Sequence, residues 1–338
     1  MPIALDLMGG DAAPEPIIAG AADAIRSDGR RLLLFGQQEV CLPLLKRYGI
    51  AEADAPFTHC DDVVPMDAKP SKAMRQRNSS MAMALAAVAA GQAEAAVSAG
   101  ASGAFMALGL RQLGRLPGVS RPAIALTLPG KPRPRMFLDA GANAECSPDM
   151  LEEFALMGSI YAELVLGIST PRVGLLCNGE EEGKGTELTR AAAARMAETS
   201  DFHFTGYAEG NDLFQGPFDV LVTDGFTGNL CLKTLEGTVR FVVDNLKQEL
   251  SADLLSSLGA MMAKGAFARL KATLDPRNHG GAPLLGLNGV AIVAHGSSDA
   301  LAIRSALRVA ANCAQQEIGA TLGERLRQLD ERRQAAKG

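Results

Sequence analysis

A short apolar run that ends in a polar residue and a glycine-rich turn recurs along this chain, and this pattern restricts the fold more than any other. It is clearest at residues 96–104, Ala-Val-Ser-Ala-Gly-Ala-Ser-Gly-Ala, where a helical pattern starts directly after the turn. Five other apolar runs end in the same way, at Asp6, Asp139, Asn178, Asp224 and His295. Strands that alternate with helices in this manner are typical of a mostly parallel α/β sheet.

The carboxyl ends of parallel strands meet at one edge of a sheet, and ligands bind in the crevice outside that edge. The sequence therefore predicts that these five residues and Ser98 lie along one rim of an open sheet. A turn that leads into a helix also presents unpaired N–H groups and the positive end of the helix dipole, which suit a phosphate or an oxyanion. For a single turn, closure of the strand–helix loop explains the glycines more simply. Because the turn recurs, the sequence favours a ligand-binding site at these strand ends.

Length and composition exclude several classes of protein. The 338 residues, 47% of them apolar, suffice for one large or two ordinary domains with a sizeable core. We recognise neither a signal peptide nor an apolar run long enough to cross a bilayer. The six cysteines lack a Cys-x-x-Cys pair and the four histidines lack ligand spacing, so no disulfide framework, metal or other cofactor is expected. A net charge of −5 argues against a nucleic-acid partner.

Hydrophobic periodicity divides most of the chain into strands and helices. Strands are predicted at 2–7, 31–35, 57–60, 94–98, 123–128, 135–139, 172–177, 202–206, 220–223 and 290–294. Helices are predicted at 15–27, 37–48, 79–91, 103–113, 149–167, 187–198, 298–318 and 324–337. The short loop between 123–128 and 135–139 indicates an antiparallel pair within a mostly parallel sheet. Residues 279–289 form a second glycine-rich loop in this prediction.

From 227 to about 273 the helical pattern is unusually long. Apolar residues recur at three- and four-residue steps from Val239 to Met261, and cations flank the later part. A core helix pair, a dimer arm and an amphipathic element that touches a membrane all fit this pattern, and composition alone favours packing.

Two polar segments stand apart from the strand and helix pattern. Residues 178–186 lack the glycine spacing and the Ser or Thr of a phosphate-binding P-loop, but Lys184 remains a plausible single phosphate contact. Residues 69–80 concentrate cations, among them Arg75, and hydroxyl groups before a helix. They fit either a contact with an anionic substrate or a solvated loop.

Five motifs, at 6–11, 98–104, 138–143, 224–229 with Leu232-Lys233, and 280–286, together resemble the PlsX family of bacterial phosphate acyltransferases over nearly the whole chain. Two departures are visible: Ala101-Ser102 stands where the family usually has Asn-Thr, and Leu7 replaces a common alanine. The resemblance implies transfer of a long-chain fatty acyl group from acyl carrier protein to inorganic phosphate, giving acyl phosphate for phospholipid synthesis. It also implies an α/β/α sandwich similar to phosphotransacetylases and isocitrate-type dehydrogenases.

The family forms homodimers and associates peripherally with the inner face of the cytoplasmic membrane, where a membrane glycerol-3-phosphate acyltransferase is a further candidate partner. By this resemblance residues 1–338 form a single α/β/α acyltransferase domain, and residues 235–277 are a projecting amphipathic helical element within it.

Phosphate is itself an anionic nucleophile, so the reaction needs no serine or cysteine nucleophile. It needs an anion cradle, oxyanion donors and protonation of the leaving thiolate. For the cradle we select Ser98, Gly100, Ser102 and Gly103. The candidate catalytic residues are Lys184 as a charge contact, Asn229 as an oxyanion donor, Asp224 to orient a donor and His295 as the acid. Further rim candidates are Asp6, Asp11, Arg75, Asp139 and Asn143.

Simpler explanations stand beside these roles: Asp224 caps a helix, Asn229 braces its own turn, and His295 is a satisfied buried histidine. Candidate membrane contacts are Leu254, Leu258, Met261, Met262 and Phe267. The candidate docking residues for acyl carrier protein are Lys264, Arg269 and Lys271, or the basic loop 131–135. The competing functions are a short-chain acyl-CoA phosphotransacetylase and a non-catalytic ligand-binding scaffold at the membrane. The lack of Gly-x-Gly-x-x-Gly after any predicted strand counts against dinucleotide binding.

Overall fold

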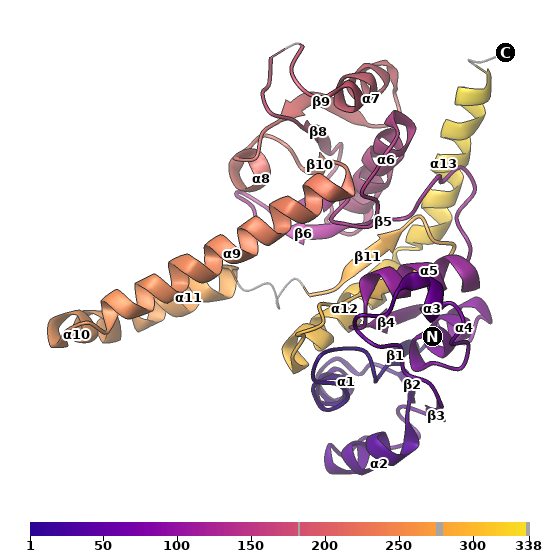
Figure 1. Ribbon diagram of the computed structural model, residues 1–338, viewed down its shortest axis with the longest axis vertical. Helices are drawn as coiled ribbons and strands as arrows, with labels where there is room; N and C mark the ends of the chain where they lie inside the picture. The colour runs from indigo at the N-terminus through magenta and orange to yellow at the C-terminus, as the bar shows by residue number, and fades with distance from the viewer. Residues whose placement is uncertain (182, 275–279, 336–338) are drawn as a thin grey trace.

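The strands of the molecule form two sheets, one of seven strands and one of five (Figure 1). The structure is a computed structural model that describes residues 1–181, 183–274 and 280–335, with only the backbone at 271–274 and 335. The seven-stranded order is β3 (Phe57–His59), β2 (Leu32–Gly36), β1 (Ile3–Asp6), β4 (Ala95–Ser98), β12 (Val290–Val293), β11 (Ala282–Leu285) and β5 (Ala123–Ile124). The five-stranded order is β6 (Leu126–Leu128), β7 (Arg135–Leu138), β10 (Val220–Val222), β8 (Arg172–Leu176) and β9 (His203–Ala208).

Most neighbouring strands are parallel, as expected for an α/β fold. The exceptions are the β12–β11, β11–β5 and β6–β7 pairs, which are antiparallel. The antiparallel pair predicted at 123–128 and 135–139 is confirmed only for β6 and β7, because residues 123–124 pair instead with β11 of the other sheet. Strand β11 lies within the segment predicted to be a glycine-rich loop. Pro283 and the flanking glycines concealed it.

The prediction of one common rim is wrong. Asp6, Ser98 and His295 follow strands of the seven-stranded sheet, whereas Asp139, Asn178 and Asp224 follow strands of the five-stranded sheet. Hydrophobic periodicity identifies where a buried strand ends, but it carries no information about which strands pair. The chain passes from one sheet to the other within a few residues, between β5 and β6.

Helices surround both sheets, and the buried apolar residues form three clusters, the largest of which joins the two sheets. They are α1 (Glu15–Asp28), α2 (Gln38–Arg47), α3 (Pro70–Ala73), α4 (Ser80–Ala89), α5 (Ser102–Gln112), α6 (Pro148–Leu164), α7 (Glu187–Glu198), α8 (Asp212–Gln215), α12 (Ala300–Gln315) and α13 (Ile318–Ala335). The core cluster joins buried residues of both sheets, such as Leu5, Val97, Leu138 and Val173, with those of α6 and α12. Burial of this apolar surface is the main force that holds the sheets together.

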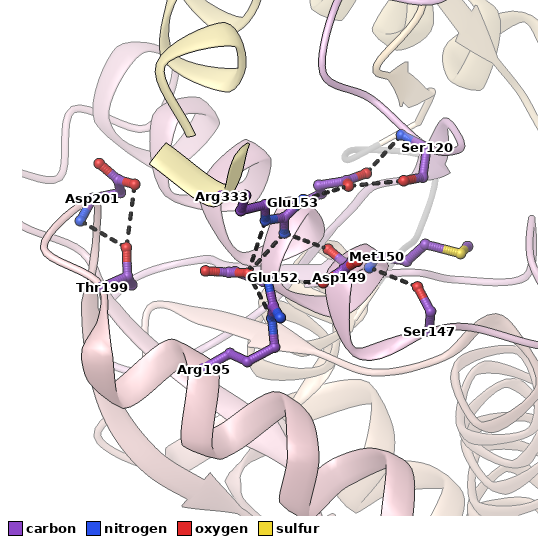
Figure 2. A network of polar contacts seen from close by, with 10 residues as sticks. All are labelled: Ser120, Ser147, Asp149, Met150, Glu152, Glu153, Arg195, Thr199, Asp201 and Arg333. Atoms are coloured by element: carbon purple, nitrogen blue, oxygen red, sulfur yellow. Dashed lines mark hydrogen bonds and ion pairs between the residues drawn. The ribbon is translucent and has the colours of Figure 1, made fainter. Parts of the chain in front are cut away.

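Ion pairs fasten the C-terminal helix to α6 (Figure 2). Arg333 of α13 donates to Glu152 at 2.7 Å and to Glu153 at 2.9 Å, and both carboxylates are buried. Glu153 also accepts hydrogen bonds from the N–H and hydroxyl of Ser120. Arg195 of α7 donates to Glu152 at 3.1 Å. The buried carboxylates are therefore paired and hydrogen-bonded, as burial of charge requires.

The long helical pattern after residue 225 is divided into three helices, α9 (Gly225–Leu250), α10 (Leu254–Met262) and α11 (Lys264–Leu274). The break is local: Asp253 caps α10 by accepting from the N–H of Ser256. In Figure 1, α9 leads away from the sheets, α10 lies at the far end and α11 leads back. Only Gly225 and Gly228 of α9 are buried. Within the described residues, no helix has both the length and the apolar character needed to cross a bilayer.

Candidate active site

At the seven-stranded sheet, the side chains at the strand ends bond to one another. The Ser98 hydroxyl donates to Asp6 at 2.6 Å and accepts from the N–H of Gly100 at 3.0 Å. Asp6 also accepts from the N–H of Met8, and burial raises the pKa of its carboxyl. A Cβ on Gly9 would lie 2.6 Å from both Asp6 Oδ2 and the Gly100 nitrogen, so glycine is required for this approach. These groups shape the turns and are occupied within the protein.

The N-terminus of α5 is open. Its cap position is Ala101, which has no side-chain acceptor, and Ser102 and Gly103 are exposed. The first N–H groups of a helix have no intrahelical partner. Across the described ranges, no acceptor is present for the N–H groups of Ser102 and Gly103. Of the four residues predicted to form the phosphate cradle, these two retain available donors.

His295 is exposed, so the explanation as a buried histidine is wrong. Its Nδ1 accepts from the N–H of Ser297 at 3.2 Å and lies 2.8 Å from the Ser297 hydroxyl. In the neutral ring, an accepting Nδ1 assigns the proton to Nε2, which is then a donor. Sequence reasoning missed the role of Ser297 in this assignment, although the His-x-Ser spacing was legible.

Asp11 lies beside the His295 turn. Its N–H donates to the carbonyl of Gly296 at 2.8 Å, and a Cβ on Gly296 would lie 3.2 Å from both Asp11 carboxylate oxygens. Gly296 also contacts Met66, whose methyl group would lie 2.6 Å from the same Cβ. Pro70 lies against Gly103, at 3.5 Å from a Cβ there. The segment 63–78 therefore runs over both the His295 turn and the start of α5.

At the five-stranded sheet, Asp139 is buried and fully bonded. One carboxylate oxygen accepts from the N–H groups of Ile124, Gly141 and Ala142, at 3.1, 3.1 and 2.9 Å. The other accepts from the N–H and side-chain amide of Asn143, at 2.7 and 2.8 Å. Burial raises the pKa of this carboxyl. Since Ile124 belongs to β5, Asp139 links the two sheets. The side chains of Asp139 and Asn143 are therefore engaged in hydrogen bonds within the protein.

The polar residues at the start of α9 differ in whether their side chains are free to bind a ligand. Asp224 accepts from the N–H and hydroxyl of Thr227, both at 2.8 Å, so it caps α9 as the simpler explanation expected. Asn229 is exposed, and a Cβ on Gly141 would lie 3.2 Å from its Cβ. In the described part of the chain, the Asn229 amide has no hydrogen-bond partner. This amide is therefore available to a ligand.

Lys184 lies in the exposed loop after β8. Its ammonium group is 4.0 Å from Glu181, a pair too exposed to hold it strongly. Asn178 accepts from the N–H of Gly185 at 2.9 Å and shapes this loop. As far as the described residues extend, no three His, Cys, Asp or Glu side chains gather as a metal site.

The proposed docking cations divide into two groups. In the loop 131–135, Arg133 pairs with the buried Asp219 at 2.8 Å, and buried Arg135 donates to the carbonyls of Lys131, Asp212 and Gly216. This loop is therefore not a free basic surface. Lys264 and Arg269 lie exposed on α11, and the Lys271 side chain lies outside the described residues.

The predicted membrane residues lie mainly on α10. Leu254 is 92% exposed and Met262 82% exposed, and Leu258 and Met261 are also exposed. Phe267 of α11 is half-buried, so it is the least available member of the predicted set.

Comparison with known proteins identifies the family to which the chain belongs. Residues 1–320 match the family model described as "Fatty acid synthesis protein". A phosphate acyltransferase of Anaeromyxobacter sp. (strain Fw109-5) is 46% identical over 315 residues, which cover 93% of this chain and 87% of the relative. One from Rhodospirillum centenum is 44% identical over 337 residues, covering 99% and 95%. The chain belongs to this family of acyltransferases.

Solved structures of lower identity support the fold. A phosphotransacetylase from Streptococcus pyogenes superposes with a TM-score of 0.62 at 17% identity, covering 94% of each chain. A branched-chain phosphotransacylase from Enterococcus faecalis V583 gives 0.59 at 16% identity, covering 92% of this chain and 99% of the other. The expected relationship to the phosphotransacetylase fold is thereby confirmed.

Proposed function

We propose that this protein transfers a long-chain fatty acyl group from acyl carrier protein to inorganic phosphate, and that the acyl phosphate serves membrane phospholipid synthesis. The family and its named relatives support transfer to phosphate. The observation that carries the proposal is the open N-terminus of α5, where Ser102 and Gly103 are exposed beside Pro70 and no side chain caps the helix. An uncapped helix N-terminus is a favourable place for phosphate.

In the proposed reaction a phosphate oxygen attacks the thioester carbonyl. The tetrahedral intermediate then expels the thiolate, which takes up a proton to become the thiol of the carrier. The N–H groups of Ser102 and Gly103 hold phosphate, with Lys184 as a charge contact. Asn229 donates to the oxyanion. His295 Nε2 protonates the leaving sulfur, and the proton that hydrogenphosphate loses on acylation replaces the one transferred, so the ring ends neutral. Asp6, Ser98 and Gly100 hold the first turn in place. Positioning contributes ~7 kcal/mol or more to lowering the barrier.

The arm formed by α9, α10 and α11 is proposed to serve assembly and localisation. Leu254, Leu258, Met261 and Met262 would contact the inner face of the cell membrane. Phe241 and Val242 of α9, 68% and 55% exposed, support a homodimer, because side chains of this kind are normally covered. The acyl phosphate product would pass to a membrane glycerol-3-phosphate acyltransferase. Leu258→Glu with Met262→Glu should abolish flotation with liposomes and leave the fold intact.

A second candidate is a short-chain acyl-CoA phosphotransacetylase, supported by the superposition on a phosphotransacetylase and a branched-chain phosphotransacylase. The deciding experiment traps acyl phosphate with hydroxylamine after incubation with phosphate and either long-chain acyl carrier protein or acyl-CoA. Product from the carrier with little from CoA is expected. Product from CoA alone would establish the second candidate. No product from either would favour a membrane scaffold.

A further inference from the structure

Lys69, Lys72 and Arg75 form a stripe of cations on the segment before α4, here called the cation stripe. The Lys72 N–H donates to the Lys69 carbonyl at 2.9 Å, and the Arg75 N–H to the Lys72 carbonyl at 3.0 Å. The N–H groups of Ala73 and Met74 also donate to the carbonyls of Lys69 and Pro70, so the segment forms the single turn of α3 with Lys69 at its N-cap. The three cations therefore follow one another at three-residue steps, at the start of α3, within it and just after it.

The segment is anchored away from the cation stripe. Ala73 is fully buried, and the Gln76 amide donates to the Val63 carbonyl at 3.2 Å. Arg111 of α5 donates to the carbonyl of Met74 at 2.7 Å, and α3 packs against α5. The backbone is thereby fixed, so the cation stripe is presented on a rigid support.

The cation stripe lacks carboxylate partners. All three side chains are exposed, and none forms an ion pair with any residue in the described ranges. By contrast, Arg133 and Arg333 pair with carboxylates. Like charges that lie near one another on a surface repel each other, and an anionic partner relieves that repulsion. A stripe of this kind in a protein of net charge −5 therefore favours binding of an anion.

The cation stripe also borders the candidate active site. Pro70, between Lys69 and Lys72, lies against Gly103 of the proposed phosphate cradle, and Met66 lies against Gly296 of the His295 turn. Lys264 and Arg269 lie instead on α11, in the arm that projects from the sheets (Figure 1). A protein that delivers a thioester must bring it to the cradle. The cation stripe is better placed for this than the arm cations that the sequence favoured.

We propose that the cation stripe is the surface on which an acidic α-helix of the acyl donor protein docks. The inference rests on the proposed function, because it assumes a donor that is a protein. An acidic α-helix presents carboxylates at successive turns along one face, and cations that recur at three-residue steps are complementary in charge to such a face. An anionic membrane would also attract cations, but the neighbouring apolar side chains, Met66 and Met74, are only 38% and 37% exposed. An acidic protein therefore fits better.

The test reverses two charges, Lys69→Glu with Lys72→Glu, and leaves Arg75 unchanged because it is a rim candidate. Acyl-phosphate formation is measured at low salt with long-chain acyl carrier protein and with an uncharged acyl-N-acetylcysteamine thioester. The KM for the carrier should rise at least tenfold, and its dependence on ionic strength should weaken. The KM for phosphate and the rate with the small thioester should stay within twofold. Reversing an acidic pair on the carrier helix should restore the KM.

The matched control is Lys264→Glu with Arg269→Glu, which should leave the KM for the carrier unchanged. An unchanged KM in the Lys69/Lys72 variant, or a raised KM only in the control, would overturn the proposal. So would loss of binding to anionic phosphatidylglycerol vesicles with the KM unchanged, since that result identifies a membrane contact. Direct binding of fluorescently labelled carrier separates the two hypotheses. A wild-type protein that binds the carrier but forms no acyl phosphate contradicts the proposed function alone, and loss of that binding in the variant supports the docking surface.

Discussion

The rims of the two sheets share one sequence pattern but use it differently. At the five-stranded sheet, Asp139 and Asn143 are buried: Asp139 accepts from the N–H of Ile124 in the other sheet, and the Asn143 amide donates to the carbonyl of Pro122. At the seven-stranded sheet, Ser102, Gly103 and His295 are exposed, and they have donors directed to no other part of the described chain. The first rim is built mainly to join the sheets, and the second is the stronger candidate for binding.

The difference lies in the position of a residue relative to its strand. Polar residues at the strand end itself, Asp6, Ser98 and Asp139, are at most 1% exposed and bonded internally. Residues a few positions later, such as Ser102 and Asn229, are exposed. The end of a buried strand lies in the core, where a polar group must find a protein partner. The later residues lie beyond the core, so they remain available to a ligand.

The largest expected difference between the two rims is in how substitutions there change the stability of the protein. Asp139→Ala removes the acceptor of five hydrogen bonds. Each buried donor left unsatisfied is costly, so the free energy of unfolding in urea should fall by about 4 kcal/mol. Asp139→Asn keeps the shape but places an NH2 group against at least two of these donors, so it should recover only part of the loss. Asp11→Ala, at the exposed turn of the other rim, should cost under about 0.5 kcal/mol. Equal effects at Asp139 and Asp11 would contradict the distinction between the rims.

The second effect is on phosphate binding at α5. Ser102 is the first residue of the helix, where proline is well tolerated, and the ψ of 116° at Ala101 is compatible with a following proline. Ser102→Pro removes the N–H and the hydroxyl, whereas Ser102→Ala removes only the hydroxyl. We expect kcat/KM for phosphate to fall about 100-fold in Ser102→Pro, because loss of one backbone donor to a bound oxyanion typically has an effect of this size. In Ser102→Ala it should fall by less than about tenfold. Equal losses would assign the role to the hydroxyl alone.

A third test compares the two ends of the five-stranded sheet. At the amino end, burial acts to raise the pKa of Asp219, but hydrogen bonds from Arg172 and Arg133 outweigh it and hold the pKa below its usual value. A lowered folded pKa gives stability that is present above about pH 4 and is lost as the pH falls through the folded pKa. Asp219→Asn should therefore lower the free energy of unfolding by about 2 kcal/mol at pH 7. The effect is not larger because both arginines are partly exposed to solvent. This difference should shrink as the pH falls below about 4.

Much of the fold could be predicted because its signals are local. The helix predicted at 187–198 agrees with α7 to the residue, since Thr186 caps it and Glu187 starts it. The division into two sheets could not be predicted, because it depends on which strands pair, and hydrophobic periodicity carries no information about strand pairing. The break at Asp253 was legible as a cap, but the apolar periodicity across it concealed the signal.

The candidate site was predictable only in part. The motifs led to the correct family, and Asp224 was recognised as a possible cap. Burial could not be read at single positions, which is why a buried His295 stood as the simpler explanation beside its role as the acid, and why Ser98 was selected as a ligand contact. Those outcomes depend on neighbours distant in the chain, such as Asp6 for Ser98. Contacts of this kind leave no periodic signal.

A fourth and smaller effect concerns the available groups of the five-stranded side. Asn229→Ala and Lys184→Ala should each lower kcat/KM about tenfold, which corresponds to ~1.4 kcal/mol of transition-state stabilisation. Circular dichroism and the urea midpoint should remain those of the wild type, because both side chains are exposed. Wild-type rates in both variants would confine the site to the seven-stranded rim.

The smallest effect distinguishes a cap from a catalytic residue. Asp224 accepts from Thr227 at the start of α9, and Asp299 caps α12 in the same way by accepting from the N–H of Ala302 at 3.0 Å. Removing an N-cap typically costs about 1 kcal/mol, so Asp224→Ala and Asp299→Ala should lower the free energy of unfolding by similar amounts. If Asp224 only caps, kcat should stay within about threefold in both variants. A loss confined to Asp224→Ala, rescued by Asp224→Asn, would show that it orients a donor, and the five-stranded rim would then contribute to catalysis as well as to assembly.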